Sequence, residues 1–309
     1  MNLNTKFSIL LTLLLSSNAF AVTGTDASSI LQQQEQLKTP TIPTQIPEFK
    51  VEQKPTAKPV PKGPSILIKS IEITGAEGLL PSEFVKAIST ESAGKELGFK
   101  EFKELSNRIT DKLKAQGYLL ARAYLPRQDI TEGHIKIAII KGSVSRNNPF
   151  SIVPGKTGYE RIENEMLLDF IKTNIAIGEP LKESDLDRAV LLMNDIPEVS
   201  VRGTMKPGDH QGETRIQFVA DEGPLFNGLA WIDNFGSESS GINQLNAQLK
   251  LNNPSGQGDQ ATLSLVHNKG TDTATLGYNL PVNGNGTRLS LSYADMDYEV
   301  ITAAGIGSG

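Results

Sequence analysis

The spacing of apolar residues divides the first folded part of the chain into strands and helices. Residues 66–73 alternate apolar and polar side chains, as a strand does, and a short helix begins at Pro81. A second helix begins near Lys100 and ends at a glycine. Its apolar stripe recurs at spacings of three and four residues and consists of Phe102, Leu105, Ile109 and Leu113. Residues 121–125 and 134–140 are predicted strands, so the order is β-α-α-β-β.

The same order of elements is predicted a second time. Strand patterns cover residues 144–153, 199–206 and 214–221, and helical patterns cover residues 163–173 and 183–194. Two sets of residues correspond at one constant offset of 84: Gly94-Lys95-Glu96-Leu97 with Glu101-Phe102, and Gly178-Glu179-Pro180-Leu181 with Asp185-Leu186. A constant offset predicts a tandem repeat of one supersecondary unit.

Beyond Gly223 the helical period disappears, and segments of about ten residues alternate between two faces. Every second residue is apolar from 245 to 251, within the stretch 242–252, and again in the stretches 261–265, 274–280 and 289–293. A soluble β-sandwich shows the same alternation over shorter strands, whereas long strands with Gly- and Asn-rich turns favour an outer-membrane barrel. We count about five strands before Gly309, and a closed single-chain barrel needs about eight or more. We therefore expect a fragment of a longer product that cannot close a pore alone.

The first 64 residues are predicted to precede the folded units. Residues 1–21 have the charged start, apolar run and Ala-Phe-Ala ending of a secretory signal peptide. Residues 22–38 predict a short polar helix, a candidate barrel plug, and the proline-rich residues 39–64 predict an extended linker.

The amino-acid composition limits the kinds of functional site that this chain can contain. A content of 38% hydrophobic residues supports a buried core, and a net charge of -5 disfavours a nucleic-acid binder. The chain has no cysteine, and its three histidines, His134, His210 and His267, lie in different regions without a triad pattern. Three acids, Asp185, Asp187 and Asp195, lie on or just after one helix and could bind a cation. Asp185 and Asp187 do not share a helix face, so a solvated helix start explains them better. We predict no enzyme, no metal, no cofactor and no small-molecule substrate.

Several collinear segments carry a family resemblance. They are residues 117–130 (GYLLARAYLPRQDI) and 133–137 (GHIKI) in the first unit, residues 178–181, 191–197 and 206–208 in the second, and residues 233–236, 240–241, 253–260 and 278–281 in the strand region. In these segments the chain resembles the two-partner secretion transporters, the haemolysin-activator and filamentous-haemagglutinin transporter proteins. The resemblance covers essentially the whole chain.

The resemblance implies an α+β fold followed by an all-β part. Two tandem β-α-α-β-β POTRA domains would occupy residues 65–142 and 143–224, followed at 225–309 by the first strands of a transmembrane antiparallel β-barrel. It also implies an outer-membrane location with periplasmic N-terminal domains and contact with outer-membrane lipid. The family's barrel has 16 strands, and its Arg-Gly-Tyr-type loop motif would lie beyond this chain, because Arg202-Gly203-Thr204 falls in the second unit.

The resemblance further implies that the second strand of the first POTRA domain lies at a sheet edge. An edge offers unpaired N–H and C=O groups to an extended client, so the partner is an unfolded secreted exoprotein, a haemolysin or an adhesin, bound through its N-terminal secretion domain. Because no G-x-x-x-x-G-K-[ST] loop occurs, transport would use no nucleotide.

We expect client contacts at six residues, for which ordinary strand and turn packing is an equally good explanation: Ala121, Arg122, Ala123, Tyr124, Leu125 and Gln128. The alternative function is a soluble periplasmic client-binding module with a vestigial β-tail. An outer-membrane assembly factor is disfavoured by the proline-rich arm and by only two repeats.

Overall fold

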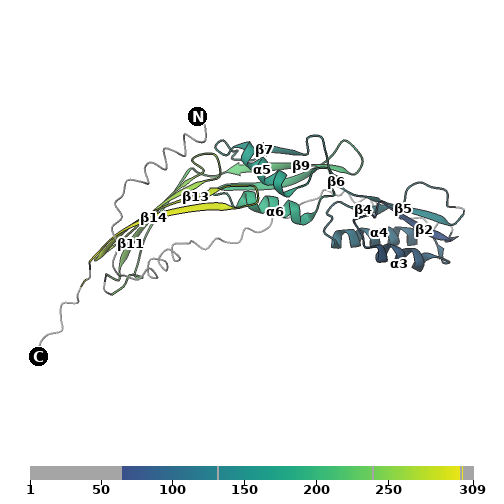
Figure 1. Cartoon of the computed structure of the whole chain (residues 1–309), viewed down its shortest axis with the longest axis horizontal. Helices are drawn as coiled ribbons and strands as arrows, with labels where there is room; N and C mark the ends of the chain where they lie inside the picture. The colour runs from purple at the N-terminus through teal and green to yellow at the C-terminus, as the bar shows by residue number, and fades with distance from the viewer. Residues whose placement is uncertain (1–64, 131, 239, 300, 302–309) are drawn as a thin grey trace, which may run out of the picture. The chain divides into compact units, whose positions relative to one another are not determined.

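The computed structural model describes residues 65–130, 132–238, 240–299 and 301 (Figure 1). The predicted signal peptide, polar helix and linker lie outside these residues. In the described part, two α/β units precede an antiparallel sheet, as expected.

The first unit contains a three-stranded sheet and two long helices. Its elements are β1 (Ile66–Leu67), β2 (Ser70–Thr74), α3 (Ser82–Ser92), β3 (Glu96–Leu97), α4 (Phe99–Ala115), β4 (Arg122–Tyr124) and β5 (His134–Ile140). The sheet order is β2-β5-β4, with β2 parallel and β4 antiparallel to β5. The edge position predicted for the second main strand, β4, is therefore present in the structure.

The prediction of one continuous strand over residues 66–73 is wrong. The N–H of Ile68 donates to the carbonyl of Lys95 at 2.9 Å, whereas the N–H of Lys69 donates to the carbonyl of Gly133 at 2.8 Å. The backbone therefore changes partner between these two residues. It pairs first with β3 and then with β5, and the strand divides there.

Alternation along β5 builds the core of the first unit. Ile135, Ile137 and Ile139 are buried, whereas His134 and Lys136 between them are exposed. The predicted apolar stripe of α4 is confirmed, because its members are all buried in the same cluster. Both helices contact strands of this sheet, and in Figure 1 they lie beside β2, β4 and β5.

The second unit has the same topology. Its elements are β6 (Ser143–Val144), β7 (Phe150–Pro154), α5 (Asn164–Asn174), α6 (Glu183–Asn194), β8 (Val199–Pro207) and β9 (Glu213–Glu222). The last strand, β9, is central, with β7 parallel on one side and β8 antiparallel on the other. This arrangement repeats that of β2, β5 and β4, which confirms the tandem repeat. Each unit has its own buried cluster.

The predicted strand over residues 144–153 is also divided. β6 pairs with the start of β9 at Glu213 and Thr214, and β7 pairs with β9 from Ile216 onward. Residues 145–149 therefore leave the sheet opposite one residue of β9, and Asn148 within them has a left-handed φ of 46°. Asparagine tolerates this conformation better than most residues do.

Five antiparallel strands follow the second unit in the described residues. They are β10 (Phe226–Asp233), β11 (Gln244–Asn252), β12 (Gln260–Asn268), β13 (Thr271–Pro281) and β14 (Arg288–Tyr298), hydrogen-bonded in chain order. None of the described helices has the length and apolarity needed to cross a bilayer.

The two faces of this sheet differ as the alternation predicts. Leu249, Leu263, Leu276 and Tyr293 lie opposite one another across four strands and are exposed. The neighbouring row on the other face consists of Lys250, Thr262, Gly277 and Ser292. The sheet therefore presents one apolar face and one polar face.

Candidate functional site

The predicted client-binding residues lie on and just after β4. Arg122, Ala123 and Tyr124 pair with Ile140, Ile139 and Ala138 of β5, and no other strand of the described chain pairs with β4. Arg122 and Tyr124 are exposed, whereas Ala121 is buried with 2% of its surface accessible. Ala123 and Leu125 are half-buried and pack against the core. Two of the six residues are therefore exposed.

The free edge of β4 is partly occupied by the neighbouring helix. The backbone N–H of Ala123 donates to Oγ1 of Thr110, on α4, at 2.9 Å. The same hydroxyl donates to the carbonyl of Ser106 at 2.9 Å, so it bridges helix and strand. Because backbone groups alternate in direction along a strand, the N–H and C=O of Ala123 both point away from β5. Thr110 therefore satisfies the N–H of Ala123 at the edge but makes no hydrogen bond to the carbonyl of Ala123.

Gln128 extends the sheet rather than facing away from it. Its Nε2 donates to the carbonyl of Lys136 at 2.7 Å, and its Oε1 accepts from the N–H of Lys136 at 2.7 Å. The primary amide thus pairs with β5 as a strand backbone would. By register this is the place of Pro126, which has no N–H to donate. The structure therefore gives Gln128 a role in sheet pairing.

The corresponding edge of the second unit is closed more completely. Asn194, at the end of α6, accepts the N–H of Val201 at 2.7 Å and donates to the carbonyl of the same residue at 3.0 Å. The neighbouring outward N–H, that of Val199, donates to the carbonyl of Ile196 at 3.1 Å. At Val201 both outward backbone groups of β8 are therefore satisfied by one side chain.

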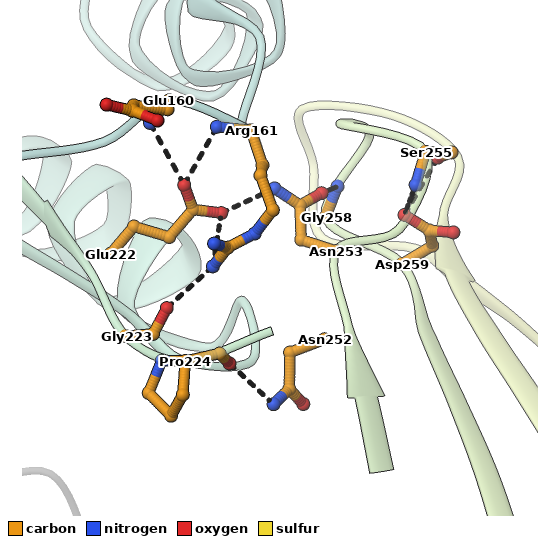
Figure 2. Close-up of polar contacts among 10 residues, drawn as sticks. All are labelled: Glu160, Arg161, Glu222, Gly223, Pro224, Asn252, Asn253, Ser255, Gly258 and Asp259. Carbon is orange, nitrogen blue, oxygen red and sulfur yellow. Dashed lines mark hydrogen bonds and ion pairs between the residues drawn. The ribbon is translucent and has the colours of Figure 1, made fainter. Parts of the chain in front are cut away.

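The second unit is joined to the sheet by a buried carboxylate. Glu222, the last residue of β9, has a side chain that is only 3% exposed. One oxygen accepts the backbone N–H groups of Glu160 and Arg161 at 3.2 and 3.0 Å. The other accepts Nδ2 of Asn253 at 2.9 Å and lies 3.2 Å from the Arg161 guanidinium (Figure 2). Each carboxylate oxygen therefore has two partners.

Asn253 belongs to the turn between β11 and β12, so Glu222 bonds directly to the sheet. Oδ1 of Asn253 accepts the N–H of Gly258 at 2.7 Å, and the backbone N–H of Asn253 donates to the carbonyl of Asp259 at 2.6 Å. Asp259 in turn accepts the N–H and hydroxyl of Ser255 at 3.0 and 2.7 Å. The turn is thus held in one shape that presents the Asn253 amide to Glu222, as Figure 2 shows.

The environment of Glu222 acts on its pKa in two directions. Burial raises the pKa, but hydrogen bonds from Asn253 and from two backbone N–H groups lower it, as does the charge of Arg161. The net result is a pKa below the ordinary glutamate value. Glu222 is therefore ionised at neutral pH and pairs with Arg161 as a charge.

A second turn of the sheet contacts the helices of the same unit. Asn174 of α5 donates to the carbonyl of Gly284 at 2.9 Å, and Arg188 of α6 donates to the carbonyl of Asn285 at 3.2 Å. In the opposite direction, Arg288 donates to the carbonyl of Asp195 at 2.8 Å. Two turns on one end of the sheet therefore dock on the second unit.

Sequence reasoning missed the residues that make these contacts. Four residues were missed because no local pattern shows which backbone or side-chain group a polar side chain reaches after packing: Thr110, Asn194, Arg161 and Glu222. Two signals were present: Thr110 and Asn194 are separated by the repeat offset of 84, and Asn253 begins a segment that carries the family resemblance.

Comparison with known proteins identifies both ends of the folded part. Residues 66–142 match the POTRA domain, ShlB-type, and residues 212–306 match the haemolysin secretion/activation protein family ShlB/FhaC/HecB. The heme/hemopexin transporter protein HuxB of Haemophilus influenzae is 25% identical over 209 residues, which are 67% of this chain and 36% of HuxB. The outer membrane transporter CdiB of Escherichia coli is 26% identical over 252 residues, which are 79% of this chain and 40% of CdiB.

A solved structure supports the same fold. The structure of CdiB from Escherichia coli is similar with a TM-score of 0.65 and 24% identity, covering 94% of this chain and 53% of that one. This chain spans well under half of the length of the two curated relatives. The two family matches, the relatives and the POTRA topology show that the chain belongs to the two-partner secretion transporters. These are outer-membrane proteins whose POTRA domains lie in the periplasm.

Proposed function

We propose that this chain captures an unfolded secreted protein in the periplasm and directs it to a pore that β10–β14 begin. Capture occurs by strand addition to β4, and transport uses no nucleotide. The observation that carries the proposal is that, among the described residues, β4 pairs with a strand on one side only and has Arg122 and Tyr124 exposed. Pairing through backbone groups depends little on which side chains the client carries, and this suits a client without fixed structure.

The second POTRA domain has a different part in this proposal. The network around Glu222 and the contacts of α5 and α6 hold it against two turns of the sheet. A client strand released from the first domain would therefore meet a second domain fixed to the strands of the transporter. In this role the second domain is an anchor.

The exposed apolar row through Leu249, Leu263, Leu276 and Tyr293 supports insertion of the sheet into the outer membrane. A soluble client-binding module would expose these side chains to water, where a large apolar patch promotes association. This observation favours the transporter over the soluble module. The relatives HuxB and CdiB are named for heme/hemopexin transport and as an outer-membrane transporter, respectively. We infer that the cargo of this chain is a secreted protein, because residues 212–306 match the haemolysin secretion/activation protein family.

Site-specific photo-crosslinking tests capture at β4. The chain is purified in detergent with p-benzoylphenylalanine in place of Arg122. The probe is reduced, carboxymethylated α-lactalbumin, which stays unfolded, and native α-lactalbumin serves as the folded comparison. The control carries the same crosslinker at Lys86, on the exposed face of α3.

We expect crosslinks from position 122 to the unfolded probe and about background yield from Lys86. Native α-lactalbumin should give no crosslink from either position. Equal yields at the two positions, or none at position 122, would contradict capture by strand addition at β4.

A further inference from the structure

The two POTRA domains contain a matched pair of polar side chains at their sheet edges. Thr110 and Asn194 are 84 residues apart, the offset that relates the two repeats. Both lie on the second main helix of their unit, and both hydrogen-bond the backbone of the edge strand beside it. Thr110 and Asn194 therefore occupy equivalent positions of the repeat and make the same kind of contact with the edge strand.

The two contacts differ in how much of the edge they occupy. Oγ1 of Thr110 accepts the N–H of Ala123 and makes no bond to its carbonyl. The amide of Asn194 accepts the N–H of Val201 and also donates to its carbonyl. A hydroxyl has one hydrogen to donate, and Thr110 donates it to Ser106, whereas a primary amide has two. The chemistry of the side chain therefore decides between a half-closed and a closed edge.

A client strand must replace these bonds with its own. Beside Ala123 it has to displace one hydroxyl, and Thr110 does not occupy the carbonyl. Beside Val201 it has to displace both bonds of an amide, and the next outward N–H, that of Val199, is bonded to Ile196. β8 continues past this point to Pro207, so the closure applies to the part of the edge that α6 borders.

We propose that the residue at this repeat position selects the domain that accepts the client strand: Thr110 leaves the edge of the first domain half-open at Ala123, and Asn194 closes the edge of the second at Val201. The occupant is an extended polypeptide that offers its own backbone N–H and C=O groups. The inference rests on the proposed strand capture and adds which domain performs it. One extra hydrogen bond to displace corresponds to a preference of roughly fivefold to tenfold for the first domain.

Exchanging the two residues tests this assignment. The crosslinker is placed at Arg122 or at Ser200, exposed residues that directly precede Ala123 and Val201. The probe is again reduced, carboxymethylated α-lactalbumin, with the whole chain in detergent. The variants are Thr110→Asn and Asn194→Thr, and the matched control is Thr110→Ser, which keeps the hydroxyl.

In the unsubstituted chain we expect a yield at position 122 roughly fivefold to tenfold above that at position 200. Asn194→Thr should raise the yield at position 200 by a similar factor, and Thr110→Asn should lower the yield at position 122. Thr110→Ser should leave both yields unchanged. If Thr110→Asn fails to fold, Asn194→Thr still decides, because it opens an edge without adding bulk.

Amide hydrogen exchange at Val201 shows independently whether Asn194→Thr has opened the edge. Equal yields at positions 122 and 200 in the unsubstituted chain would overturn the selection and leave strand capture standing. Faster amide exchange at Val201 without a higher crosslinking yield at position 200 would also overturn the selection and leave strand capture standing. No crosslink at either position would overturn strand capture itself, and the selection with it.

Discussion

The two POTRA domains share one topology but differ at their surfaces. In the first, the edge strand β4 is half-closed by Thr110, and Arg122 and Tyr124 beside it are exposed. In the second, Asn194 closes the edge at Val201, and Glu222 at the end of the central strand is buried against a turn of the sheet. The cores are built alike, so a few polar side chains distinguish the repeat that we propose captures the client from the repeat that we propose acts as an anchor.

The largest effect should come from removing the buried carboxylate of the anchor. Glu222→Ala removes the carboxylate that pairs with Arg161 and accepts from Asn253 and two backbone N–H groups, and it leaves Arg161 only the carbonyl of Gly223. Breaking a buried charge pair in this way costs about 3–5 kcal/mol. We expect that loss in the free energy of unfolding of the second domain, measured by urea titration in detergent.

Glu160→Gln is the matched control for Glu222→Ala. Glu160 carries a charge in the same network region but contributes only its backbone N–H, and its side chain is exposed. We expect a change within about 0.5 kcal/mol. A loss as large in the control as in Glu222→Ala would show that the buried network does not anchor the domain.

The next effect should come from placing a second carboxylate opposite the first. Asn253→Asp removes the amide donor 2.9 Å from Glu222 and puts a like charge there. We expect a loss of about 2–3 kcal/mol at neutral pH, since an unsatisfied acceptor and charge repulsion add. The same urea titration measures it.

Asn253→Gly separates the charge from the lost hydrogen bonds. Glycine tolerates the left-handed φ of 53° at this position and carries no charge. Asn253→Asp should be the less stable variant at pH 7, and the gap should narrow near pH 4, where carboxylates take up protons. A gap independent of pH would refute charge repulsion as the cause.

A smaller effect is expected in the capture domain at Gln128. Gln128→Ala removes two hydrogen bonds to the backbone of Lys136, which should lower the stability of the first domain by about 1–2 kcal/mol. Crosslinking of the unfolded probe from position 122 should persist, because the outward groups of β4 are untouched. Arg127→Ala, at an exposed neighbouring side chain, is the control and should change stability little. Loss of crosslinking in folded Gln128→Ala would instead give Gln128 a role in client contact.

The smallest effect is a pH dependence of the anchor. The pKa of Glu222 is lowered in the folded protein, so its contribution is present above the ordinary glutamate pKa and is lost as pH falls through the lowered value. Stability of the second domain should therefore decline below about pH 4. Glu222→Gln should flatten that decline, as followed by thermal unfolding at a series of pH values. An unchanged acid slope in this variant would assign the decline to other carboxylates.

Local pattern predicted most of the elements and failed where a strand changes partner. The strand at residues 134–140 and the helix at residues 183–194 have the predicted bounds, because each keeps one buried face throughout. The predicted strands at 66–73 and 144–153 are each divided, because separate parts of the backbone pair with different strands or at different registers. In the first of these segments the buried positions shift from Ile68 to Ile71 and Ile73, so the alternation changes phase where the backbone changes partner.

The sequence by itself determined the repeat, the element order and the two faces of the strand region. These depend on periodicity and offset, which are properties of neighbouring residues. Only the tertiary structure decided that Thr110 reaches Ala123, that Gln128 replaces a strand at Lys136, and that Glu222 meets Asn253 across 31 residues of chain. Hydrogen bonds between distant residues depend on how packed elements bring them together, and no local pattern in the chain encodes that distance.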